Sequence, residues 1–219
     1  MNCQQTAPDC TDSTKLLREF KASGFVTLQC AVQPGRVAEL CAAYDEIMIP
    51  SSSPDFKAGS TTDRRYFGRE IVLDDVYQHP LLLAISEHLI GRPVKLRSLL
   101  GRTVRAGSPA QALHTDVGRD SADAPVVGFI LMLDAFTPVN GATRFIPGSQ
   151  RWLDFPFDRL EDPRLDSEGQ VPACGAAGSI IVFNASVWHG HTANVTPQAR
   201  RSIQGYFGRD RADRKPSGL

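Results

Sequence analysis

The pattern of apolar residues changes at Val94, and this change constrains the fold more than any other feature of the sequence. Before it, apolar residues recur at helical spacing; after it come short apolar and β-branched runs separated by turn residues. We expect strands over residues 99–104, 112–117, 126–135, 142–146, 179–188 and 201–207. Many short strands after a helical segment are typical of a mainly β fold with flanking α-helices, here a jelly-roll barrel with helices on one outer face.

The first part of the chain predicts three helices and one short strand. One helix begins near residues 12–14 and ends at Gly24, a second runs from Pro34 to Pro50, and a third covers residues 80–89, with a strand over 25–28. Residues 51–69 have no periodicity, which is typical of a functional lid or of disorder. We expect residues 1–219 to form a single domain, with 1–93 as mainly helical support and 94–208 as the jelly-roll core.

Asn140-Gly141 lies between two of the predicted strands. This dipeptide is a strong signal for a two-residue β-hairpin, because both central positions of that turn need a positive φ. We therefore expect a hairpin there.

Composition limits the classes of partner. Lys+Arg and Asp+Glu both number 24, so the formal net charge is zero, which argues against nucleic acid or an anionic membrane. No apolar run approaches the ~20 residues of a membrane span. The five cysteines are scattered and odd in number, and the N-terminus lacks the pattern of a signal peptide. These features predict reduced thiols and a cytoplasmic location.

His114-Thr115-Asp116 is the first candidate for chemistry. On a strand, residues i and i+2 point to the same face, so an imidazole and a carboxylate would lie side by side while Thr115 points away. Such a pair supplies two legs of a facial metal site. A histidine from a distant strand would complete the 2-His-1-carboxylate set that holds Fe(II) and leaves positions open.

The third leg has two candidates, His189 and His191, which share a face if the strand continues through both. We prefer His189, because it follows an apolar run and the small Gly190 beside it leaves room for ligands. The competing interpretation of either residue is a hydrogen-bonded barrel histidine.

Arg200 lies 11 residues beyond His189, at the start of the last predicted strand. If residues 193–197 form a turn, its guanidinium returns beside His189 and can hold a dicarboxylate through two parallel hydrogen bonds. Arg201 is the neighbouring alternative.

These residues fall in an order that resembles the phytanoyl-CoA dioxygenase family of Fe(II)/2-oxoglutarate-dependent oxygenases. The likeness covers about residues 94–208 and fits the helical first part more loosely. The motifs that carry it are Leu113-His114-Thr115-Asp116, Asn140-Gly141, Pro147-Gly148-Ser149-Gln150, His189-Gly190-His191-Thr192-Ala193-Asn194, and Arg200.

The resemblance implies a double-stranded β-helix (cupin-like) core, iron on His114, Asp116 and His189, and 2-oxoglutarate anchored by Arg200. O2 would be the second cosubstrate. The resemblance also puts Arg102 on the strand before His114, at a position where relatives carry polar or basic residues facing the pocket. Arg102 is therefore a second candidate for binding 2-oxoglutarate or an anionic substrate.

Two positions depart from the family pattern. Gln150 stands where a histidine is usual after Pro147-Gly148-Ser149, in a turn that we expect to be structural. Ile130 stands where some relatives carry an aromatic residue near the cosubstrate.

The reaction implied by the resemblance is hydroxylation or a related C–H oxidation, with succinate and CO2 released. Related halogenases carry a small residue at the carboxylate position, whereas Asp116 is present here. The substrate would be a small metabolite or natural-product intermediate, and Arg64, Arg65, Arg102 and Arg105 favour an anionic one. Residues 51–69 and the insert 152–174 are candidate lids. Oligomeric state is not readable from the sequence.

Two other functions use the same ligands. A cupin-like isomerase, lyase or hydrolase would hold zinc or another divalent ion in this triad and would not need Arg200. A non-catalytic ligand-binding barrel would keep the ligands without turnover.

Overall fold

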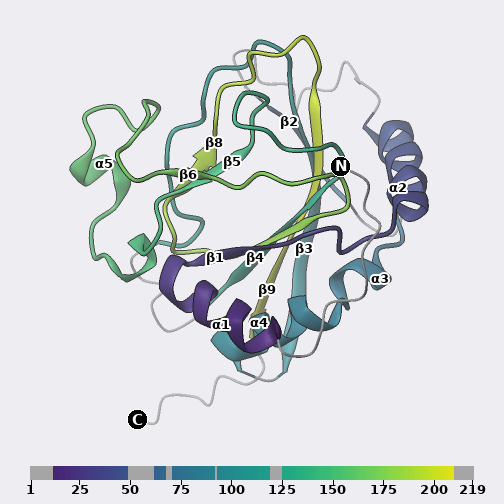
Figure 1. Ribbon diagram of the computed structural model, residues 1–219, viewed down its shortest axis with the longest axis horizontal. Helices are drawn as coiled ribbons and strands as arrows, with labels where there is room; N and C mark the ends of the chain where they lie inside the picture. The colour runs from purple at the N-terminus through teal and green to yellow at the C-terminus, as the bar shows by residue number, and fades with distance from the viewer. Residues whose placement is uncertain (1–11, 49–61, 68–70, 92, 119–124, 210–219) are drawn as a thin grey trace, which may run out of the picture.

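The computed structural model describes residues 12–48, 62–67, 71–91, 93–118 and 125–209. Nine strands in these residues form two antiparallel sheets (Figure 1). The larger has the order β1-β7-β4-β9-β3-β2, and the smaller β6-β5-β8. The strands are β1 Phe25–Leu28, β2 Thr62–Tyr66, β3 Val94–Val104, β4 Val127–Met132, β5 Thr143–Phe145, β6 Val171–Pro172, β7 Ile180–Asn184, β8 His189–His191 and β9 Arg200–Arg209.

The helices lie mainly along one side of the larger sheet (Figure 1). They are α1 Asp12–Ser23, α2 Pro34–Ile47, α3 Asp74–Tyr77, α4 Pro80–Ile90 and the short α5 Pro156–Arg159, with a 3-10 turn over Ser149–Arg151. The predicted helices in the first part of the chain are therefore confirmed to within a few residues. Pro34 begins α2 and Gly24, at φ 87°, follows the end of α1, as the sequence indicates.

Alternation along β4 and β7 divides the core into two layers. Phe129, Leu131 and Val182 point to the helices, where they join the largest apolar cluster. Ile130 and Phe183 point the other way, into the space between the sheets, and pack with Phe145 of the smaller sheet. Every residue of β4 is buried because both of its faces are covered. The inner layer is where the polar residues of the barrel are found.

Several strand predictions need correction. Residues 112–117 form no strand; His114 makes one isolated bridge to His189, and the amide of Asp116 donates to the carbonyl of Ala185 instead. The predicted strand 179–188 is too long: β7 ends at Asn184, and the chain then passes to the other sheet, where β8 begins at His189. β3 begins five residues before the expected start.

The hairpin predicted at Asn140-Gly141 is wrong. β4 pairs with β7 and β9, whereas β5 pairs with β6 and β8, so the turn links two sheets rather than two neighbouring strands. The Asn140 side chain closes this wider turn by accepting from the Thr137 amide at 2.8 Å and donating to the Ala135 carbonyl at 2.8 Å. Gly141 has the positive φ that the dipeptide predicted, 82°.

The segment 51–69 is described only in part. Residues 62–66 form β2 at the edge of the larger sheet, paired with β3, and Phe67 packs edge-on against Tyr44 in the core. This part is therefore ordered structure and not an aperiodic loop. Residues 51–61, 68 and 69 lie outside the described residues, as do the side chains of Arg64 and Arg65.

No helix in the described part of the chain is both long and apolar enough to cross a bilayer. Cys41 and Cys174 are free thiols. Cys30 is disulfide-bonded, which corrects the expectation that all five cysteines are reduced. The cytoplasmic location stays a prediction from the sequence.

Candidate metal centre

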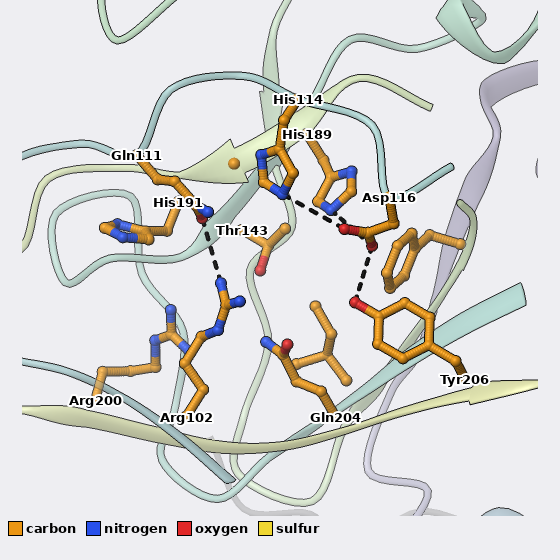
Figure 2. A pocket seen from close by; sticks show the side chains of 13 residues that line it. Arg102, Gln111, His114, Asp116, Thr143, His189, His191, Arg200, Gln204 and Tyr206 are labelled. Carbon is orange, nitrogen blue, oxygen red and sulfur yellow. Dashed lines mark hydrogen bonds and ion pairs between the residues drawn. The ribbon is translucent and has the colours of Figure 1, made fainter. Parts of the chain in front are cut away.

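His114, Asp116 and His189 meet at one end of the space between the sheets (Figure 2). His114 and His189 exchange both backbone hydrogen bonds, at 2.8 and 2.9 Å, which fixes the two imidazoles next to each other. Nε2 of His114 lies 3.5 Å from Oδ1 of Asp116, and Nε2 of His189 lies 3.3 Å from Oδ2. The potential donor atoms all lie within 4.8 Å of one another, a spacing that one metal ion can bridge.

Backbone carbonyls orient both imidazoles. Nδ1 of His114 lies 3.0 Å from the Ala112 carbonyl, and Nδ1 of His189 lies 2.9 Å from the Val187 carbonyl. A carbonyl only accepts, so each Nδ1 carries the proton and each Nε2 lone pair is directed to the centre. This is the arrangement by which proteins prepare histidine for a metal.

The charge states also suit a cation. Burial, and then the neighbouring His189, lower the pKa of His114 and favour its neutral form. Burial would raise the pKa of the Asp116 carboxyl, but the two imidazoles outweigh this effect and hold that pKa below its usual range. Two imidazoles that direct Nε2 to the centre and one carboxylate match the donor set of an Fe(II) facial triad, and the residues present therefore fit that metal.

His191 lies elsewhere. Its ring is on the far side of the cavity, beside Gln111, with Nδ1 2.8 Å from the Thr192 carbonyl (Figure 2). Burial, and next the positive charge of Arg200, lower its pKa to about 4. The fold thus brings His189, and not His191, to His114 and Asp116.

A polar cavity extends from the triad between the sheets. The side chains around it include both predicted arginines (Figure 2). The full lining is Arg102, Gln111, His114, Asp116, Ile130, Thr143, Phe183, His189, Gly190, His191, Arg200, Gln204 and Tyr206. Ile130 is therefore an aliphatic part of this wall.

Arg200 and Arg201 point to opposite faces of β9. Arg200 is 1% exposed and lies over the ring of Phe136, 4.1 Å from its centroid. It donates to the Ser202 hydroxyl at 3.1 Å and to the Gly141 carbonyl. Arg201 instead forms ion pairs with Asp134 and Asp45, both at 2.7 Å. The arginine that reaches the cavity is Arg200.

Tyr206 is a residue of the site that sequence reasoning missed. Its hydroxyl donates to Oδ2 of Asp116 at 2.9 Å. The period of two along β9 places it on the cavity face with Arg200 and Gln204, so the same alternation that separates Arg200 from Arg201 could have found it. Gln111 and Thr143 were also missed, and no local pattern distinguishes them.

The insert 152–174 is anchored, not a free lid. Arg144, which has no exposed surface, donates to the carbonyls of Pro163, Arg164 and Leu165 at 2.9–3.1 Å. It also reaches the Gln111 carbonyl at 3.1 Å, and the Leu113 amide donates to the Pro163 carbonyl at 2.9 Å. The insert is thereby bonded to the segment that carries His114.

The model of the phytanoyl-CoA dioxygenase (PhyH) family matches residues 20–202 of the chain. This chain belongs to the phytanoyl-CoA dioxygenase family. The match extends well into the helical first part, where the sequence motifs gave little support. The PhyH-family enzyme described here is a 2-oxoglutarate-dependent non-haem iron dioxygenase.

Known proteins resemble it over most of its length. Dioxygenase ALT11 of Alternaria alternata is 28% identical over 91% of this chain and 72% of its own. The epimerase SnoN, crystallised with Fe3+, alpha ketoglutarate and nogalamycin RO, superposes with a TM-score of 0.74 at 20% identity, over 91% of this chain and 84% of SnoN. HygX of Streptomyces hygroscopicus, with nickel and 2-oxoglutarate bound, gives 0.71 at 17%, over 89% and 86%. The predicted double-stranded β-helix fold is thereby confirmed.

Gln150, one of the departures from the family motif, has a structural contact. Its side-chain amide donates to the Lys21 carbonyl at 3.1 Å, near the end of α1. The turn around Pro147-Gly148-Ser149 thus binds the barrel to the first helix, in agreement with the structural role expected for it.

Proposed function

We propose that this PhyH-family enzyme oxidises a C–H bond of a small metabolite or natural-product intermediate. Fe(II) would be held by His114, Asp116 and His189, with 2-oxoglutarate and O2 as cosubstrates. The observation that carries the proposal is that three converging metal donors and a buried arginine line the same cavity. Two structural relatives support that class of substrate: SnoN is an epimerase from nogalamycin biosynthesis, and HygX was crystallised with hygromycin B bound.

Arg200 would bind the distal carboxylate of 2-oxoglutarate. Burial, and then the positive charge of Arg102, lower its pKa to about 9, and it forms no ion pair with any described carboxylate. Its buried Nε has no hydrogen-bond partner among the described residues. A buried cation left in this state gains most from an anionic ligand, and a guanidinium binds a carboxylate with two parallel hydrogen bonds.

Arg102, Gln111 and Thr143 would complete the cosubstrate site. Arg102 donates to Oε1 of Gln111 at 3.3 Å and extends toward the triad from the floor of the cavity (Figure 2). In this position it adds a second positive charge between Arg200 and the metal donors. We propose that it orients the carboxylate nearer the metal, and not that it binds an anionic substrate.

Iron with 2-oxoglutarate and O2 supplies the oxidising power for removing a hydrogen atom from the substrate, and succinate and CO2 are the coproducts. The protein would hold the metal on one face, direct Nε2 of both imidazoles to it, and bind the cosubstrate by its carboxylates. Asp116 occupies the position that a halogenase leaves for halide. We therefore propose hydroxylation, or a related C–H oxidation, over halogenation.

The test is succinate formation from 2-oxoglutarate by the purified protein in air, with and without Fe(II). We expect succinate only with Fe(II). A substrate that is hydroxylated should give a product 16 mass units heavier than the substrate, which is the mass of one oxygen atom. Absence of succinate with Fe(II) would favour the cupin-like isomerase, lyase or hydrolase, or the non-catalytic barrel. A chlorinated main product in the presence of chloride would exclude the hydroxylase.

A further inference from the structure

A second cavity adjoins the metal donors. It is lined by His114, Thr115, Asp116, Val117, Gly118, Phe155, Pro156 and Phe157. His114 and Asp116 line both cavities, so both adjoin the metal centre. The first cavity contains two guanidiniums. Among the described residues that line the second, the ionisable groups are the two metal donors.

The wall of this second cavity is built by the insert. Phe155, Pro156 and Phe157 form the start of α5, and the Asp158 carboxylate accepts from the Phe155 amide at 2.8 Å to cap that turn. Arg144 holds the rest of the insert through hydrogen bonds to the insert's backbone carbonyls and to Gln170, whose Oε1 lies 2.8 Å from Nη1 of Arg144. The aromatic wall is thus held in place before any ligand binds, which lowers the ordering cost of binding.

An exposed phenylalanine is costly to leave in water without a role. Phe157 is 68% exposed, although it lines the cavity next to Asp116. Trp152, at the start of the insert, packs edge-on against Trp188 and lies beneath Arg159, so it is already engaged. Phe155 and Phe157 line the cavity beside the metal donors. Apolar surface of this kind, beside a site of chemistry, marks ligand binding.

We propose that the second cavity binds the substrate through an apolar ring system that packs against Phe155 and Phe157. This inference rests on the proposed function and names the substrate class for it. Arg102, one of the arginines that favoured an anionic substrate, lines the cosubstrate cavity instead.

The experiment measures binding of Nile red, a neutral polycyclic dye whose emission shifts to the blue in apolar surroundings, to the protein loaded with Ni(II) and 2-oxoglutarate. The variants are Phe155→Ala and Phe157→Ala. The control is Leu165→Ala, because Leu165 is 65% exposed on the same insert but does not line the cavity. Removing a phenyl ring from the contact should weaken binding about tenfold or more, whereas the control should stay within about twofold of the parent. Progesterone, a neutral tetracycle, should displace the dye, and the polycation hygromycin B should not.

The inference is overturned if the parent protein does not bind Nile red, if all three variants behave alike, or if hygromycin B displaces the dye and progesterone does not. Binding of 2-oxoglutarate to the Fe(II) protein, followed by visible absorption, is measured in the same four proteins. It should be equal in all of them. If it is missing from the parent, the proposed function fails, whereas the dye experiment, done on the protein without metal and 2-oxoglutarate, still decides what the second cavity binds.

Discussion

Tyr206 donates a 2.9 Å hydrogen bond to Oδ2 of Asp116, the carboxylate oxygen that also faces His189. The bond ties the metal-binding carboxylate on an irregular segment to a regular strand of the larger sheet. It also occupies lone pairs of Oδ2, which leaves Oδ1 as the freer oxygen for a metal. Tyr206 is thus a positioning residue for Asp116.

Tyr206→Phe should weaken binding of Co(II), used as a spectroscopic substitute for Fe(II), about 10- to 100-fold, because a ligand loses the partner that orients it. The visible absorption bands of the bound Co(II) should also shift, because the carboxylate reorients. The control is Tyr44→Phe, which removes another buried hydroxyl, bonded to Thr103 at 2.8 Å and remote from the triad. Equal Co(II) spectra and affinities for Tyr206→Phe and the parent would contradict the positioning role.

The two histidines of β8 should behave differently toward metal. His189→Gln should abolish stoichiometric Fe(II) binding, measured by equilibrium dialysis, because it removes one of three converging donors. His191→Gln should retain Fe(II), since the His191 ring lies on the far side of the cavity (Figure 2). Loss of iron from His191→Gln with retention in His189→Gln would reassign the third ligand.

Arg200→Gln should weaken 2-oxoglutarate binding to the Fe(II) protein roughly 30-fold or more, the loss that follows when a buried charge pair is truncated. Titration calorimetry provides the measurement. Arg201→Gln is the matched control: it should leave that affinity unchanged but lower the free energy of unfolding by about 1–3 kcal/mol, because it breaks the contacts with Asp134 and Asp45. If the two variants exchanged these effects, the cosubstrate role would belong to Arg201.

The metal donors illustrate what the sequence can predict. His114 and Asp116 were expected side by side because they would share a strand face. The strand does not form, yet one isolated bridge keeps the backbone extended enough for both to reach the centre. The alternation rule was also right that His189 and His191 share a face, since both line the same cavity. Only the pairing of His189 with His114 separates them, and that pairing joins residues 75 positions apart.

Long-range hydrogen bonds explain most of what was missed. The insert was predicted only as a candidate lid, because its order comes from one side chain in another strand. Arg144 lies in β5, and the acceptors that hold the insert are mainly backbone carbonyls, which any sequence could supply. Neither the composition nor the spacing of residues 152–174 indicates such a contact.

Arg144→Met should therefore be the most destabilising of the substitutions considered. It removes the donor of three backbone carbonyls, those of Gln111, Arg164 and Leu165, in a place where the guanidinium has no exposed surface, while the Pro163 carbonyl keeps the Leu113 amide. Each unsatisfied buried group costs on the order of 1–3 kcal/mol, although water can reach some of them. We expect the free energy of unfolding to fall by about 3–5 kcal/mol in urea titrations.

Arg159→Met is the control for this loss, because it removes an arginine from the same insert whose side chain is 53% exposed and pairs, among the described residues, with Asp154 and the Trp152 ring. Its cost should stay within about 1 kcal/mol. Proteolysis of the folded proteins separates local from global effects: cleavage within residues 160–170 should appear early in Arg144→Met and not in Arg159→Met. Equal stability and equal cleavage of the two variants would mean that the insert is held by its apolar contacts, such as Leu160 against Trp188, rather than by Arg144.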